Sequence, residues 1–354
     1  MATIPLRTRL ALKLEQRLHH NLKKVHPLRQ LFWECTLRCN VNCLHCGSDC
    51  KHDATKADMP AQDFLRAIDS ITPHVDPRQV MIIVSGGEPL VRRDLEEVGR
   101  ELHRRQYPWG IVTNGLLLTR ERLNSLLAAG MLSTTVSLDG LEEDHNWMRG
   151  HQHSFEKAVQ GIRLLAQTNG LAWDVVTCVN RRSIKRLPEL KEFLISIGVK
   201  EWRVFTIVPM GRAAGNAELQ LTNQEFRSLM DFIVDTRKEG RILMSYSCEG
   251  FLGEYEGRVR DHLYSCQAGI TVGSILHDGT ISGCMSIRYD YRQGNIYEDD
   301  FMDVWNNRFL VYRNREWARR DGCADCKLFS YCEGNAMHLH DDEGRLMFCH
   351  LDRM

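Results

Sequence analysis

The sequence predicts an α/β protein: a partial (β/α)6 barrel of the TIM type with a cysteine-rich C-terminal extension. Its 354 residues are enough for such a barrel and an appendage. Between residues 31 and 240, short apolar runs alternate with longer helical patterns, which is typical of a parallel sheet. Beyond residue 240, glycine, cysteine and aromatic residues become frequent and helical periodicity mostly stops. A doubly wound open sheet is the alternative, because the pattern alone does not separate the two folds.

Residues 1–30 predict a basic amphipathic helix. Its leucines recur four apart and therefore form one stripe of a helix. They are Leu6, Leu10, Leu14, Leu18 and Leu22. We expect this stripe to pack on the body of the protein, in preference to a membrane surface or a partner.

Residues 31–240 predict the barrel. The candidate strands are 31–35, 80–85, 110–113, 134–138, 174–179 and 201–207. The helical patterns between them cover 60–71, 92–105, 120–129, 154–168 and 185–197. Six β-then-α units in series imply right-handed crossovers. The loops that follow the strands then form the active face.

Composition narrows the class of protein. Lys and Arg equal Asp and Glu at 46 each, so we expect no general nucleic-acid binding. The longest apolar runs are strand-length, and the N-terminus lacks the apolar core of a secretory signal. We therefore expect no transmembrane segment and a cytoplasmic location. Disulfides are rare there, so 13 cysteines indicate metal binding or catalysis.

Three cysteines follow the first predicted strand: Cys39, Cys43 and Cys46. Their thiolates can converge on one iron–sulfur cluster and leave one iron open, because such clusters normally take four cysteines. The alternative is a zinc site, to which His45 and Cys50 could contribute. Cys178 stands alone in the sequence, and we expect it to be a small buried hydrophobic residue.

The spacing Cys39-x3-Cys43-x2-Cys46 resembles the signature of the radical SAM superfamily. Further motifs follow in the same order as in that family. The resemblance implies that Gly86, Gly87, Glu88 and Pro89, after the second strand, meet the methionine amino group of S-adenosylmethionine. The paired glycines suit a close approach of the backbone, and a carboxylate can pair with an ammonium. The other cofactor contacts that it implies are Asn114, Ser137, Asp139, Arg149, Arg203 and His45.

The resemblance also implies a reaction. A [4Fe–4S] cluster on Cys39, Cys43 and Cys46 binds S-adenosylmethionine through its open iron. One electron, from a flavodoxin or a ferredoxin, cleaves the cofactor to methionine and a 5′-deoxyadenosyl radical, which abstracts hydrogen from the substrate. The protein orients the cofactor and excludes water.

A second cysteine group occupies the predicted extension, residues 241–354. On its own it is ambiguous between zinc and iron–sulfur. Downstream of a radical SAM core it resembles a SPASM domain, which carries auxiliary [4Fe–4S] clusters. The resemblance implies an outer cluster on Cys323, Cys326, Cys332 and Cys349.

The inner auxiliary cluster is incomplete in this sequence. Cys266 and Cys284 fit the pattern, but Ala336 stands where the family has cysteine. Cys248 is a candidate third ligand, or else a hydrogen-atom donor. The candidates for the fourth position are His338, His340 and the substrate. We therefore expect one or two auxiliary clusters.

The resemblance favours an oxidoreductase-type peptide maturase that crosslinks, epimerises or oxidises a peptide or small protein. Short strings near both ends also resemble a radical SAM/SPASM subfamily found beside small peptide or lipoprotein genes. An enzyme of cofactor or small-molecule biosynthesis is the alternative. A non-enzymatic iron–sulfur or zinc protein is the third reading.

Overall fold

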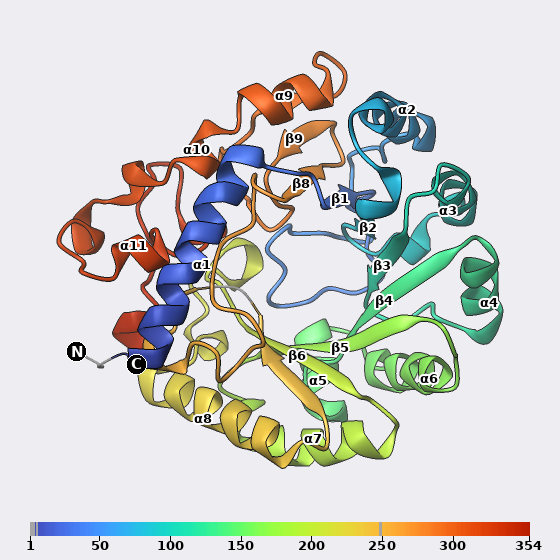
Figure 1. Ribbon diagram of the computed structural model, residues 1–354. Coiled ribbons are helices and arrows are strands. Elements are labelled where there is room, and N and C mark those ends of the chain that lie inside the picture. The colour runs from blue at the N-terminus through green and yellow to red at the C-terminus, as the bar shows by residue number, and fades with distance from the viewer. Residues whose placement is uncertain (1–3, 5, 248–249) are drawn as a thin grey trace.

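The computed structural model describes residue 4 and residues 6–247 and 250–354, and within them one curved sheet organises the chain (Figure 1). Its strand order is β10-β9-β8-β1-β2-β3-β4-β5-β6-β7. The first seven strands are β1 (Gln30–Glu34), β2 (Met81–Ser85), β3 (Trp109–Thr113), β4 (Met131–Ser137), β5 (Ala172–Val179), β6 (Glu201–Thr206) and β7 (Leu243–Tyr246). Each of these pairs in parallel with the next.

The helices between these strands lie outside the curve of the sheet (Figure 1). They are α2 (Ala61–Ile71), α3 (Leu95–Arg104), α4 (Arg120–Ala128), α5 (Glu142–Arg149), α6 (Ser154–Ala166), α7 (Leu187–Ser196) and α8 (Asn223–Glu239), of which α5 sits nearer the centre. Packing of α2 on the sheet is typical: Phe64 stacks on Trp33 of β1, with ring centroids 4.2 Å apart. Helices on the outer side alone are the arrangement of a partial barrel, so the barrel prediction is confirmed against the doubly wound alternative.

All six predicted strands form, as β1 to β6. The seventh parallel strand, β7, was not predicted, because four residues are too few for a periodic signal. The helix before it is well marked, since Thr222 and Glu225 form a capping box at the start of α8. Gly240 ends that helix at φ 71°, a conformation that favours glycine.

The cysteine-rich extension continues the same sheet. Strand β8 (Val272–Ile275) pairs in parallel with β1, and β9 (Thr280–Ser282) and β10 (Gly294–Asn295) follow in antiparallel pairing. Three short helices complete the extension: α9 (Phe301–Asn307), α10 (Leu310–Arg313) and α11 (Phe329–Cys332). The boundary at residue 240 stays a prediction, and the sheet itself runs across it.

Helix α1 (Leu6–Val25) crosses the molecule beside α11 (Figure 1). It does pack on the body, but not through the predicted leucine stripe. The buried residues are Leu12 and His19, whereas Leu10 and Leu14 are each 60% exposed. The expectation for the stripe was therefore wrong, because a spacing of four reveals a stripe without saying which side of the helix meets the protein. No helix in the described ranges is long and apolar enough to cross a membrane.

We predict that Glu333→Gln loosens α1. Glu333 lies 2.5 Å from Lys23 Nζ and 3.5 Å from His19 Nε2. Burial opposes its ionisation, but His19 and Lys23 outweigh burial and lower its pKa to about 2. Loss of a charged hydrogen bond costs about 1.5 kcal/mol, so amides of residues 6–25 should exchange with deuterium about ten-fold faster. Glu298→Gln is the control, because that exposed side chain has no basic partner among the described residues; equal exchange in both variants contradicts the prediction.

Candidate functional site

The site lies where the parallel strands end. The loop after β1 carries Cys39, Cys43 and Cys46, and these thiols pack in one cluster with Val41 and Cys50. Cys39 and Cys43 are each only 7% exposed. The three predicted ligands therefore do come together, in an apolar setting that suits a cluster sensitive to water.

Each of the three sulfurs faces at least one N–H donor. The Cys50 backbone N–H lies 3.4 Å from Cys46 Sγ. Asn114 Nδ2, after β3, lies 3.8 Å from Cys39 Sγ, and Arg149 Nη1, at the end of α5, lies 3.6 Å from Cys43 Sγ. Donors aimed at sulfur stabilise the thiolate form that iron requires. The residues present thus fit a cluster at this loop.

Without iron these thiols are weak acids. Burial raises the pKa of Cys39 to about 12, and burial also raises the pKa of Cys43. Cys46 differs, because hydrogen bonding from Cys50 lowers its pKa. Loading of iron must therefore displace protons from at least the two more buried thiols.

The glycine motif after β2 lies directly on this cysteine loop. Gly87 N donates to Thr36 O at 2.7 Å, and Glu88 N donates to Arg38 O at 2.9 Å. A Cβ on Gly86 would lie 2.4 Å from Thr36 O, and the φ of Gly86 is 132°. Only glycine permits this approach and this conformation. Gly86 and Gly87 therefore position the cluster loop.

The Glu88 carboxylate is fully buried and joins neighbouring loops. It accepts hydrogen bonds from Thr113 Oγ1 and Asn114 N, each at 2.7 Å, and from Leu90 N at 3.1 Å. Burial raises its pKa, whereas these donors favour its charged form. In this structure Glu88 thus serves the protein's own backbone, with Pro89 beginning the turn that follows. Its contact with a methionine amino group stays a prediction.

Asp139 and Arg149 form a buried pair beside the cluster loop. Asp139 Oδ2 lies 2.7 Å from Arg149 Nε, and the two residues are 1% and 7% exposed. Burial alone raises the pKa of Asp139, but Arg149 outweighs it and keeps the carboxylate ionised. Since Arg149 also reaches Cys43, the pair connects the end of β4 to a predicted iron ligand.

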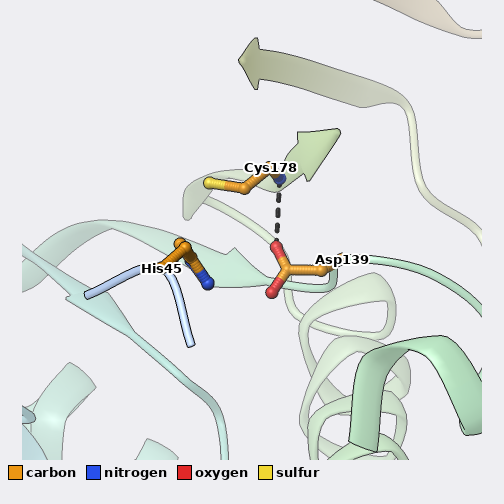
Figure 2. A group of neighbouring side chains, drawn as sticks. All are labelled: His45, Asp139 and Cys178. Atoms are coloured by element: carbon orange, nitrogen blue, oxygen red, sulfur yellow. Dashed lines mark hydrogen bonds between the residues drawn. The ribbon is translucent and has the colours of Figure 1, made fainter. Parts of the chain in front are cut away.

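Two further side chains converge on Asp139. Figure 2 shows His45, Asp139 and Cys178 as neighbours; the Cys178 backbone N–H faces Asp139 and donates to its Oδ1 at 3.0 Å. One nitrogen of His45, one oxygen of Asp139 and Cys178 Sγ all lie within 4.8 Å of one another. Burial lowers the pKa of His45 to about 4, so its ring is neutral at pH 7. Cys178 was expected to be a core residue; it packs on apolar neighbours such as Ile207 and yet reaches this site.

Arg203 lies within strand β6. It pairs with Asp174 of β5 through both nitrogens of its fork and donates to Thr135 Oγ1 of β4 at 3.0 Å. Its side chain is 41% exposed. Ser137, at the end of β4, is 8% exposed. The roles of Ser137 and Arg203 in binding the cofactor stay predictions.

Sequence reasoning missed one cluster between barrel and extension. Glu34 ends β1 and is fully buried; it lies 3.0 Å from His277 Nδ1 and 2.8 Å from Arg288 Nη1. Both partners come from the extension, about 240 positions away, so no local pattern could have revealed them. The only available signal was an acidic residue at the end of a strand that is otherwise apolar.

The outer auxiliary site is well formed. The thiols of Cys323, Cys326, Cys332 and Cys349 line one cavity of about 280 Å³. The Asn335 backbone N–H donates to Cys332 Sγ at 3.2 Å. Four thiols around one cavity fit a closed iron–sulfur cluster.

The inner auxiliary site does not fit a cluster in the same way. Cys266 and Cys284 are near neighbours: burial and then Cys266 raise the pKa of Cys284. Cys266 lines a cavity of about 20 Å³, room for about one water, and Cys284 is not part of its lining. His340 is already engaged, with Nε2 at 2.6 Å from Gly334 O and Nδ1 at 3.2 Å from Gly344 O. Cys248 lies outside the described residues.

The fold and these sites define an iron–sulfur enzyme built on a partial barrel. A model described as the radical SAM superfamily matches residues 33–194, and one described as the SPASM iron–sulfur cluster-binding domain matches residues 266–327. The chain thus contains a radical SAM domain, followed by a SPASM domain. The protein therefore uses S-adenosylmethionine and a [4Fe–4S] cluster, and its SPASM domain binds auxiliary iron–sulfur.

Three similar proteins illustrate the range of relatives. An AdoMet-dependent heme synthase of Methanosarcina barkeri is 27% identical over 323 residues, which are 86% of this chain and 90% of the relative. The mycofactocin maturase MftC of Mycolicibacterium smegmatis is 28% identical over 312 residues, which are 87% of this chain and 77% of the relative. The crystal structure of Streptococcus suis SuiB bound to precursor peptide SuiA has a TM-score of 0.70 and 18% identity, covering 90% of this chain and 75% of that one.

We predict that anaerobically reconstituted protein holds about eight irons, from two clusters of about four each. Cys39→Ala with Cys43→Ala and Cys46→Ala should remove about four, and so should Cys323→Ser with Cys326→Ser. Cys266→Ser with Cys284→Ser should remove none, because the inner site lacks a full ligand set. Iron and sulfide analysis with EPR measures each count. About 12 irons that fall to about eight in the Cys266 and Cys284 variant contradict the prediction, as does zinc in place of iron.

We predict that Asp139→Asn lowers the free energy of unfolding by about 3 kcal/mol, because it leaves the Arg149 charge buried without its partner. Asp174→Asn is the matched control. Its partner Arg203 is part-exposed, so the loss should stay within about 1 kcal/mol. Anaerobic denaturant titration measures both. Equal losses in the two variants contradict the special role of the buried pair.

Proposed function

We propose that this enzyme abstracts hydrogen from a peptide or small protein and so matures it by crosslinking, epimerisation or oxidation. The mycofactocin maturases support this, since they match 87% of the chain. The observation that carries the proposal is the charge balance of the site. Three arginines contact barrel strands or the cysteine loop, and each already has an acidic partner.

The three pairs are Arg149 with Asp139, Arg203 with Asp174 and Arg288 with Glu34. Because their charges cancel, the site offers hydrogen-bonding groups without a strong positive field. Such a surface suits a neutral peptide backbone better than a polyanion. It also retains hydrogen-bond donors: Arg203, although paired with Asp174, still donates to the Thr135 hydroxyl.

The residues of this chain bind and orient the cofactors, and they exclude water from the site. Cys39, Cys43 and Cys46 would hold the cluster, and the donors on their sulfurs would favour its thiolate ligands. When bound, the cluster would supply one-electron reduction and S-adenosylmethionine would supply the chemistry of hydrogen abstraction. The Asp139–Arg149 pair fixes polar groups next to that centre. We propose a flavodoxin or a ferredoxin as the electron donor.

Synthesis of a haem-type cofactor is the second candidate. It is favoured by the heme synthase relative, which matches 86% of this chain across 90% of its own length. An iron porphyrin is a planar macrocycle with several carboxylates, and its recognition calls for unpaired cations. The three paired arginines argue against that ligand, and for this reason we rank the peptide first.

The test uses full-length enzyme reconstituted under anaerobic conditions, with dithionite and S-adenosylmethionine. Deuterated peptides encoded beside the gene are one substrate, and Fe-coproporphyrin III is the other. We expect deuterium to pass from peptide to 5′-deoxyadenosine, with a matching mass change in the peptide. Mass spectrometry measures both products. Conversion of the porphyrin without conversion of any peptide favours the second candidate, and the Cys39/Cys43/Cys46→Ala variant should be inactive on both.

A further inference from the structure

Helix α1 presents an apolar stripe to solvent. Its leucines are exposed by 67% at Leu6, 60% at Leu10, 60% at Leu14 and 50% at Leu18, and Val25 is 71% exposed. A helix turns about 100° per residue, so these side chains share a sector of about 120°. Isolated exposed leucines are ordinary, but a continuous stripe of them marks an interaction surface.

The same helix is strongly basic in a chain that has no net charge. Its sequence, LRTRLALKLEQRLHHNLKKV, holds six Lys and Arg but one acidic residue. Arg7, Lys13, Arg17 and Lys24 are exposed, and none has a carboxylate within salt-bridge distance in the described part of the chain. These cations lie among and beside the leucines. The stripe and the charges therefore form one surface, which we call the outer face of α1.

We propose that the outer face of α1 docks this enzyme on a membrane surface that contains anionic phospholipid. Leucines enter the boundary between headgroups and acyl chains, and the flanking cations meet lipid phosphates. The helix lies in the plane of the membrane and does not span it, in keeping with its hydropathy. A second copy of the chain is a poorer occupant, because two such helices would bring like charges together.

The opposite face of α1 stays fixed to the protein in this arrangement. Gln16 Nε2 donates to Ser330 O at 3.0 Å, and Lys23 Nζ binds Glu333. Leu12 and His19 fill the contact beneath. Docking therefore requires neither release nor refolding of the helix. It also orients the extension, because α11 carries Cys332 and borders Glu333.

The test is sedimentation of the full-length reconstituted enzyme with vesicles. We expect binding to vesicles of phosphatidylcholine and phosphatidylglycerol at about 3:1, weak binding to phosphatidylcholine alone, and weakening with added salt. Leu10→Ser with Leu14→Ser and Leu18→Ser should weaken binding by about ten-fold or more, and so should Lys13→Gln with Arg17→Gln and Lys24→Gln. The matched control changes exposed leucines elsewhere, Leu132→Ser with Leu243→Ser and Leu310→Ser, and should bind like wild type.

Folding is checked separately, because all six changed residues of α1 face solvent. Iron content, melting temperature and cleavage of S-adenosylmethionine should match wild type in both α1 variants. Absence of binding to the mixed vesicles overturns the proposal, as does equal binding by the α1 leucine variant. A dimer that dissociates in that variant, without vesicle binding by wild type, overturns it in favour of a contact between copies. None of these outcomes depends on conversion of a substrate, so the vesicle test is independent of the proposed function.

Discussion

The buried carboxylate of Glu88 is the point on which the geometry of the site depends. A charge removed from water is tolerated only when its hydrogen bonds are replaced, and here a hydroxyl and two backbone N–H groups replace them. Its own backbone N–H meanwhile holds the cysteine loop. The ends of β1, β2 and β3 are therefore fixed to one another through a single residue. The donors that reach the sulfurs of Cys39 and Cys43 come from the loop after β3 and from the end of α5.

Much of the fold followed from local patterns, and the exceptions share a physical cause. Periodicity identified β1 to β6 because short, mainly apolar runs alternate there with longer helical patterns. It missed β7, which is short and gains its stability from pairing with β6. It misassigned the outer face of α1, because burial there is decided by Leu12, His19 and the partner surface, none of which a spacing reveals. Tertiary contacts override propensity in both cases.

The site shows the same division. Motifs located the cysteines, the glycine pair, Asp139 and Arg149, since each has a recognisable neighbour in sequence. Their partners could not be read in this way: Asp174 meets Arg203, and Cys178 meets Asp139, only because parallel strands bring distant residues to one level. Ala336 correctly indicated that the ligand set of the inner auxiliary cluster is incomplete. The structure adds that Cys284 does not line the small cavity beside Cys266, which no alignment of motifs could have indicated.

The pairing of β8 with β1 has a consequence for how this chain is made. Gln30 of β1 meets Val272, so one edge of the first strand stays unpaired until about 240 further residues have been synthesised. An unpaired edge of an apolar strand is a template for association with other chains, and contacts so distant in sequence form slowly. The extension thus completes the barrel sheet by covering this edge of β1. A barrel truncated before β8 would keep the edge unpaired. A variant without the auxiliary domain should therefore aggregate before its catalytic activity can be measured.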